Sequence, residues 1–170
     1  QGGVQWMTAG RGIIHSEMPE QEKGLLQGFQ LWINLPSKNK MMSPKYQEYS
    51  EKEIPTELRP DGSVIKVIAG RVSSGLKGPV EQPLTNPMYI DISMPINSEF
   101  CESIPGDHSA FIFVIEGGLV ALTEENKKVE VDEGVICTLS KGKIIKIWTK
   151  NKSARFLLIA GRPLGEPIVR

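Results

Sequence analysis

Short runs of β-branched and aliphatic residues, separated by glycine and proline, recur through this sequence and constrain its fold more than any other feature. Runs of this kind at regular spacing are typical of antiparallel β-sandwiches and β-barrels. We therefore predict an all-β protein of the barrel or sandwich type, with a tight turn at Glu116–Gly117. The expected strands are VIKVIAG (64–70), MYIDISM (88–94), AFIFVIEG (110–117), GLVALT (118–123), GVICTL (134–139), KIIKIWT (143–149) and RFLLIAG (155–161).

The segment 88–94 shows the clearest strand pattern, because Ile90 and Ile92 alternate with polar or aromatic residues. Such alternation predicts a strand with one buried face. No segment sustains a helical stripe. The best candidate, residues 43–55, is mostly charged and bracketed by prolines, so we expect at most a short helix there. Residues 37–62 as a whole are polar and contain proline, which is typical of a linker.

Two stretches of the sequence resemble each other and indicate an internal repeat. When Gly3–Val4 is aligned on Gly134–Val135, Ile13–Ile14 falls on Ile144–Ile145 without a gap. The shared order and spacing favour a duplicated β domain.

The repeat predicts that the first domain is truncated and the second is complete. Only Gln1 and Gly2 precede Gly3, whereas the second copy has a long β-rich stretch, from Val64 onward, before Gly134. We therefore expect about one and a half domains. Residues 1–36 would be the C-terminal part of a first domain, residues 37–62 a linker, and residues 63–170 a complete second domain. The alternative is a single irregular β domain with an N-terminal arm.

Charge and composition exclude several function classes. Twenty basic and twenty acidic residues cancel, so no overall field attracts nucleic acid or an anionic membrane. The apolar runs are too short to cross a bilayer. The sequence begins at Gln1 without a secretory signal, and we expect a fragment or processed product of a cytoplasmic protein, or a nuclear one in a eukaryote. Cys101 and Cys137 lie far apart beside apolar residues, which favours buried thiols over a disulfide.

The densest candidate for chemistry is GRGIIHSE (10–17), which contains one of the two histidines. If this segment is extended, His15 and Glu17 project from the same face. An imidazole and a carboxylate together suit a divalent first-row metal such as non-haem iron. The preceding Gly10–Gly12 turn permits backbone conformations closed to other residues and could direct the pair into a barrel. The alternative is a solvated polar strand face, the commoner setting of an isolated His-x-Glu pair.

The second unit carries no equivalent pair. In the repeat alignment His15 and Glu17 fall on Lys146 and Trp148. A metal site around His108 would need a second histidine on the same strand face, at the position where Ala110 stands. We therefore expect the second unit to be free of metal and His108 to have a structural or loop role.

Several segments closely resemble the pirins, a family of bicupin proteins with two facing β-barrel domains. The resemblance is carried by GGVQWMTAGRGIIHSEMP (2–19), GFQLWINLP (28–36), KMMSPKYQEY (40–49), VIAG (67–70), AFIFVIEG (110–117) and LLIAGRPLGEP (157–167). It implies a complete C-terminal cupin, free of metal, preceded by the last strands of an N-terminal cupin. It also implies a non-haem iron in the N-terminal cupin, held by three histidines and one glutamate. His15 and Glu17 match two of these ligands, and the His-x-His motif that would supply the others is absent from this sequence.

The resemblance implies more than one function. Some similar proteins are quercetin 2,3-dioxygenases, in which Glu17 would accept the proton of a flavonol hydroxyl, and Trp6 and Met7 would either line an apolar pocket or belong to the core. Other pirins are iron-dependent transcriptional co-regulators or scaffolds for a metabolic enzyme, with residues 37–62 as a candidate contact surface. Since no DNA-binding element is evident, such a role would go through a protein partner. We expect this chain alone to be catalytically inactive and able to self-associate.

Overall fold

The computed structural model describes residues 2–16, 24, 27–123 and 125–168. Within these ranges the chain forms strands and two short 3₁₀ helices, η1 (Ser37–Asn39) and η2 (Glu51–Glu53), and no α-helix. The all-β prediction is confirmed. The strands are β1 (Val4–Thr8), β2 (Lys45–Tyr49), β3 (Thr56–Leu58), β4 (Val64–Ala69), β5 (Met88–Met94), β6 (Glu99–Ser103), β7 (Ser109–Leu122), β8 (Lys128–Asp132), β9 (Ile136–Leu139), β10 (Ile144–Trp148) and β11 (Ala154–Gly161).

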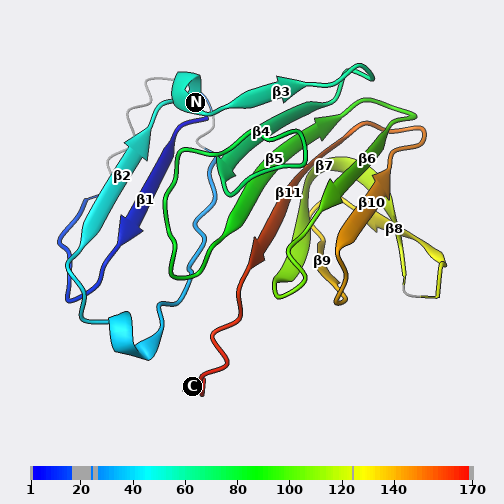
Figure 1. Cartoon of the computed structure of the whole chain (residues 1–170). Helices are drawn as coiled ribbons and strands as arrows, with labels where there is room; N and C mark the ends of the chain where they lie inside the picture. The colour runs from blue at the N-terminus through cyan, green and yellow to red at the C-terminus, as the bar shows by residue number, and fades with distance from the viewer. Residues whose placement is uncertain (1, 17–23, 25–26, 124, 169–170) are drawn as a thin grey trace.

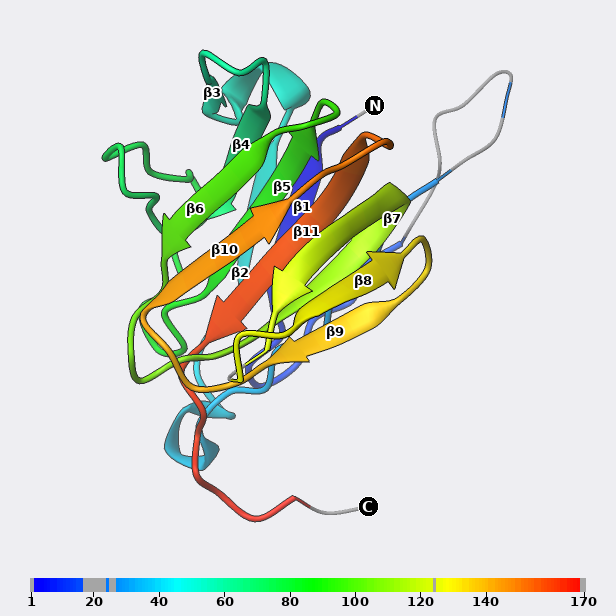
Figure 2. The ribbon, with the colours of Figure 1, turned by 90° about the vertical axis from the view of Figure 1, so that its right-hand side faces the viewer.

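A nine-stranded antiparallel sheet dominates the molecule. Its order is β3-β4-β5-β11-β7-β10-β6, and β8 and β9 also pair with β7. The sheet curls so that β6 and β10 lie in front of β5 and β11 when viewed from the side (Figures 1 and 2). This curled sheet is the cupin-type domain expected in the second part of the chain. No helix in the described part of the chain is both long and apolar enough to span a membrane.

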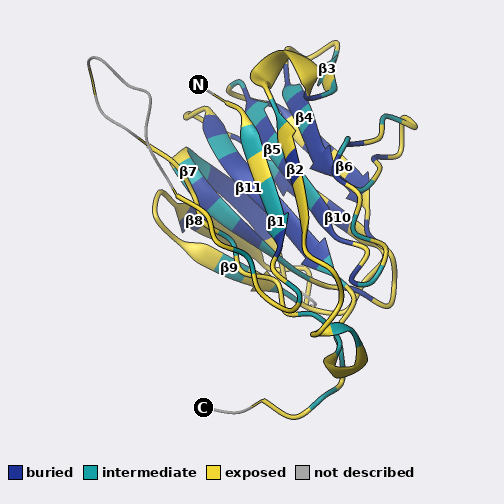
Figure 3. Cartoon of the chain, turned by 90° about the vertical axis from the view of Figure 1, so that its left-hand side faces the viewer, coloured by how far each residue is buried: buried dark blue, intermediate teal, exposed yellow. Residues whose placement is uncertain are grey.

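Apolar side chains from all sides of the curled sheet fill its interior. Burial alternates along β5 as its sequence predicts, with Ile90 and Ile92 fully buried. Phe100 and Phe156 meet edge to face with their ring centroids 5.7 Å apart, a favourable arrangement for two aromatic rings. Each fully buried side chain of this kind contributes about 1.5–3 kcal/mol. The interior is therefore a packed core. Figure 3 shows that buried residues are concentrated on the strands of the large sheet.

The turn predicted at Glu116–Gly117 is wrong, because both residues lie within the single strand β7. The strand continues through this point, pairing with β9 and β11 before the bend and with β8 and β10 after it. Gly117 has φ +77°, and a Cβ there would lie 1.9 Å from the carbonyl oxygen of Ser153. The two glycines thus bend one strand around the barrel and do not reverse the chain.

The expected linker, residues 37–62, also contains paired strands. β2 pairs with β1 in a two-stranded ribbon, and β3 pairs with β4 at one end of the large sheet. The 3₁₀ helix η2 matches the short helix expected within residues 43–55. This segment therefore builds part of the structure and does more than connect two units, while the domain boundaries remain predictions.

The cysteines differ from expectation in one respect. Both are free thiols, but Cys101 is exposed and Cys137 is half-buried. On β6 the side chains of Phe100 and Glu102 point inward, which turns the intervening Cys101 outward. Its neighbours in the sequence do not determine its burial.

The direction in which each side chain of β10 points is relevant to the alignment of the proposed repeat. Ile145 and Ile147 point into the core, whereas Lys146 is exposed and Trp148 lies on the outer face. The indole Nε1 of Trp148 donates a hydrogen bond to Glu99 at 3.0 Å.

The repeat alignment therefore matches His15 and Glu17 to outward-facing positions of β10. A register shifted by a single position aligns Gly12 with Gly142 and matches the pair to the two inward-facing isoleucines. Because side chains alternate along a strand, such a shift exchanges its faces. If His15 points into a barrel in the first copy, the shifted register is the one that matches it to an inward-facing residue of the second copy. In neither register does the second copy have a histidine and a glutamate at the two matched positions.

Candidate functional site

The ribbon of β1 and β2 leads into the segment that carries His15. Val4 and Trp6 pack against a cluster that includes Ile54, Ile68 and Val80 on the outer side of the large sheet. Figure 3 shows the ribbon in front of β5 and β11. Trp6 therefore packs against this cluster, which is separate from the barrel core.

Polar contacts also fix the ribbon to the barrel. The side-chain amide of Gln47 donates to the carbonyl oxygen of Glu81 at 3.1 Å and accepts from its N–H at 2.9 Å. The Gln82 amide donates to Thr8 Oγ1 at 3.0 Å, and the Tyr49 hydroxyl donates to a backbone carbonyl at 3.0 Å. Both Gln47 and Thr8 are buried, so the end of β1 has a defined position on the barrel.

The Gly10–Gly12 turn has the conformation that its glycines predict. Gly10 has φ +53° and Gly12 has φ +125°. A Cβ on Gly10 would lie 2.2 Å from the carbonyl oxygen of Met42, and the same oxygen accepts a hydrogen bond from the N–H of Arg11 at 2.9 Å. The glycine at position 10 is required because the turn packs directly against the backbone that leads into β2.

His15 follows this turn in a segment without strand pairing. Its side chain is exposed, and it makes no hydrogen bond or ion pair within the described residues. Ile14 beside it is fully exposed, at 102% of its reference area. Glu17 lies outside the described residues. The same-face arrangement of His15 and Glu17 therefore remains a prediction.

His108 has the opposite environment. Its side chain is 1% exposed, its Nδ1 lies 2.8 Å from Asp107 Oδ1, and its Nε2 lies 2.7 Å from the carbonyl oxygen of Asn86. Both ring nitrogens are thus within hydrogen-bond distance of a partner in the protein. A buried ring engaged at both nitrogens supports the expected structural role.

Asp107, the acidic neighbour of His108, also pairs with Arg162 at the surface. The hydrogen bond from His108, followed by that from Arg162 at 2.9 Å, lowers the pKa of Asp107 below its ordinary value. The Asp107 carboxylate thus bridges a buried ring and an exposed guanidinium.

The described residues do not form the implied iron site by themselves. They contain no group of three or more histidine, cysteine, aspartate or glutamate side chains placed to hold a metal ion. Among these residues His15 has no hydrogen-bond partner, while His108 is engaged elsewhere. A site of three histidines and one glutamate needs two histidines beyond His15, and the sequence has only His108 to add.

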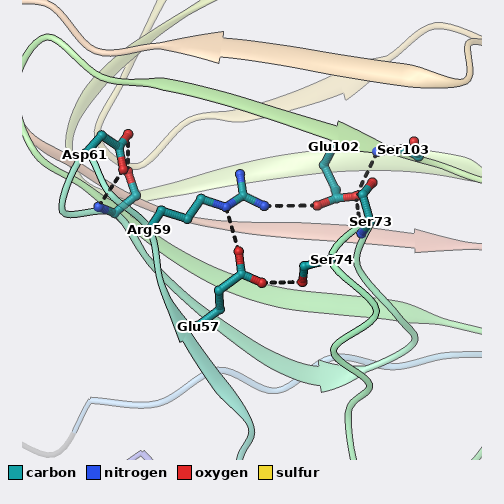
Figure 4. A network of polar contacts seen from close by, with 8 residues as sticks. Glu57, Arg59, Asp61, Ser73, Ser74, Glu102 and Ser103 are labelled. Carbon is teal, nitrogen blue, oxygen red and sulfur yellow. Dashed lines mark hydrogen bonds and ion pairs between the residues drawn. The ribbon is translucent and has the colours of Figure 1, made fainter.

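A buried carboxylate that the sequence reasoning missed lies on β6. The Glu102 side chain is fully buried and accepts from the N–H and hydroxyl of Ser73, from the N–H of Ser103 at 2.9 Å, and from Arg59 at 3.3 Å (Figure 4). The Arg59 guanidinium also lies 5.3 Å from the ring centroid of Phe100. The available signal was the alternation in EFCES (99–103), which places Glu102 on the same face as Phe100. This network ties the loop after β4 to β6.

Models of known protein families match two separate parts of the chain. Residues 1–33 match a family model described as Pirin, and residues 89–170 match one described as Pirin C-terminal cupin domain. A pirin-like protein of Caulobacter vibrioides is 41% identical over 167 residues, which cover 98% of this chain and 58% of that protein. Pirin-1 of Arabidopsis thaliana is 43% identical over 171 residues, covering 99% of this chain and 58% of its own length. The chain thus spans less than two thirds of the length of these relatives.

A solved structure supports the same relationship at the level of the fold. Quercetin 2,3-dioxygenase from Acinetobacter baumannii superimposes with a TM-score of 0.78 and 26% sequence identity, over 99% of this chain and 58% of that one. The curled sheet and the ribbon together therefore have a counterpart in a solved protein.

Proposed function

This chain belongs to the pirin family of cupin proteins, and from this membership we propose that the protein is an iron-binding bicupin with quercetin 2,3-dioxygenase activity. The observation that carries the proposal is the structural likeness to a quercetin 2,3-dioxygenase over almost the whole chain. The substrate class would be a flavonol, a flat aromatic molecule with an acidic hydroxyl group.

We propose His15 and Glu17 as two of the iron ligands. Bound iron would supply a Lewis acid and template for oxygen and the flavonol oxygen atoms. The ring of His15 is exposed and makes no hydrogen bond to any residue that the structure describes, which supports its part in this assignment. We also propose Glu17 as the base that accepts the flavonol hydroxyl proton, which requires a carboxyl pKa near the working pH. The remaining histidines are not among these 170 residues.

The test compares iron content and quercetin turnover in two proteins: one with the full length of its curated relatives and one with the present chain alone. We expect the longer protein to bind iron and cleave quercetin, and the present chain to do neither. In the longer protein, His15→Ala should lower iron affinity at least about 10-fold, since loss even of groups that support ligands costs that much. The matched control is Ser16→Ala, which removes a small exposed side chain next to the same histidine. Iron content unchanged by His15→Ala would contradict the ligand assignment.

A second candidate function is protein binding without catalysis, and the exposed apolar side chains favour it. Several of them lie between positions 14 and 46 of the sequence, including Trp32 at 93% exposed and Met41 at 75%. Exposed apolar surface of this kind often marks a protein contact. A full-length protein that binds iron but leaves quercetin unchanged would favour this function, which includes an iron-dependent co-regulator or an enzyme scaffold, over the dioxygenase.

A further inference from the structure

One end of the barrel has a hollow that the proposed iron site does not use. β4 and β6 end here, and β5 and β7 begin here, as Figure 1 shows. The hollow has a volume of about 260 Å³, and its lining includes Gly70, Arg71, Lys77, Asn86 and His108. We refer to it as the barrel mouth.

The barrel mouth is suited to a small ligand held at the entrance. The barrel interior below it is filled by the apolar core, so a ligand cannot enter deeply. Pockets for drug-sized ligands measure about 300–1,000 Å³, and the hollow lies just under this range. It therefore fits a small organic molecule better than a dinucleotide or a large cofactor.

Two cations face each other at the barrel mouth. Arg71 and Lys77 are directly opposite in an antiparallel bridge, and both are exposed. Neither forms an ion pair with a described acid, and none of the described residues that line the hollow is acidic. Like charges placed directly opposite in a sheet destabilise it. An anion bound between them would remove this repulsion.

Side-chain and backbone hydrogen bonds to two carboxylates fix the loop that carries Arg71 and Lys77. Ser73 donates to the buried carboxylate of Glu102 through its N–H, at 2.8 Å, and through its hydroxyl. Ser74 donates to Glu57 (Figure 4). Arg71 Nη1 donates to the carbonyl oxygen of Gly75 at 2.6 Å, so the guanidinium has a defined position and keeps N–H groups for a ligand. Positions fixed in this way lower the entropy cost of binding.

We propose that the barrel mouth binds a small molecule through an oxyanion, either a carboxylate or a phosphate, held between Arg71 and Lys77. The planar guanidinium matches the geometry of either group, and the ammonium adds a second charge. On the other side of the hollow, His108 holds Asn86 through its carbonyl oxygen. The site needs no metal and no contribution from His15.

The experiment measures binding of inorganic phosphate and, separately, of succinate by calorimetry and by amide chemical shifts of Gly70 and Gly75. Sodium chloride at the same ionic strength is the reference. We expect saturable binding with shifts confined to the barrel mouth. Arg71→Gln and Lys77→Gln should each weaken binding about two- to five-fold, the range for an exposed ion pair, and the double variant should abolish saturation. Lys128→Gln removes an exposed cation from β8 and is the matched control.

A second readout separates binding from general charge effects. Without an oxyanion, Lys77→Gln should raise Tm at low salt, because it removes the repulsion with Arg71. A given concentration of phosphate or succinate should raise its Tm less than that of the unmodified protein, and should not raise the Tm of the double variant. The tighter of the two probes identifies the ligand class. The proposal is overturned if neither probe binds more tightly than chloride, or if the double variant binds as the unmodified protein does. Retention of oxyanion binding in His15→Ala distinguishes this site from the proposed iron site.

Discussion

The two histidines of this chain differ in what surrounds their ring nitrogens. His15 is exposed and has no hydrogen bond within the described residues, whereas His108 is buried with an acceptor at each nitrogen. A buried polar group needs such partners, because leaving it unpaired costs about 1–3 kcal/mol. The environment of His108 is thus that of a structural residue, while His15 has no partner among the described residues and stays a candidate ligand.

Asp107 provides a prediction about acid stability. Its pKa is lowered mainly by the hydrogen bond from His108, so its contribution to stability is present above its unfolded pKa of about 4 and is lost as pH falls through the folded value. We expect Asp107→Asn to be less stable than the unmodified protein at neutral pH, with the difference shrinking below about pH 4. Tm measured from pH 2.5 to pH 7 tests this.

The control is Asp132→Asn, which removes an exposed acid of β8 whose side chain has no hydrogen bond or ion pair among the described residues. It should leave the shape of the pH profile unchanged. An unchanged profile in Asp107→Asn as well would show that the carboxylate contributes nothing to acid stability.

At the scale of elements, β7 is the strand that shapes the barrel. A Glu-Gly-Gly sequence between two apolar runs resembles a hairpin turn, which is why residues 110–123 are predicted to form two strands. In the structure Gly117 bends a single strand because the chain of β11 lies directly against it. A turn and a bend both need glycine, so local sequence does not distinguish them.

Gly117→Ala should destabilise the protein. Its φ of +77° is strained for alanine, at a cost of about 1–3 kcal/mol, and the new Cβ would meet the Ser153 carbonyl oxygen at 1.9 Å. Gly118→Ala is the matched control, since its φ is not in the left-handed region and its nearest contact would be 3.4 Å. Urea unfolding should show a clear loss for the first variant and a smaller effect for the second. Equal midpoints for the two variants would contradict the bend as described.

At the scale of the whole molecule, the ribbon of β1 and β2 is joined to the barrel by an apolar cluster and by side-chain hydrogen bonds to residues 79–82. These contacts connect the segment before His15 with the barrel formed by the large sheet. The segment that carries the proposed iron ligands therefore follows a ribbon whose position the large sheet helps to determine.

Gln47→Ala should loosen this ribbon without unfolding the barrel. It leaves the N–H and carbonyl groups of Glu81 without their partner, at a cost of about 1–3 kcal/mol. We expect faster amide hydrogen exchange in β1 and β2, with unchanged protection at Ile92 in the barrel. Lys45→Ala, an exposed change on the same strand, is the control. Equal exchange in both variants would show that Gln47 does not hold the ribbon.

The sequence by itself determined the all-β class, most of the strands of the second domain and the family. These follow from local alternation, as in residues 88–94, and from a contiguous motif around His15. Only the tertiary structure decided that Cys101 faces outward, that Gly117 bends a strand, and that Glu102 is buried beneath the loop carrying Arg71 and Lys77. The physical reason is that each of these depends on atoms brought together from distant parts of the chain, whereas strand alternation depends only on the next residue.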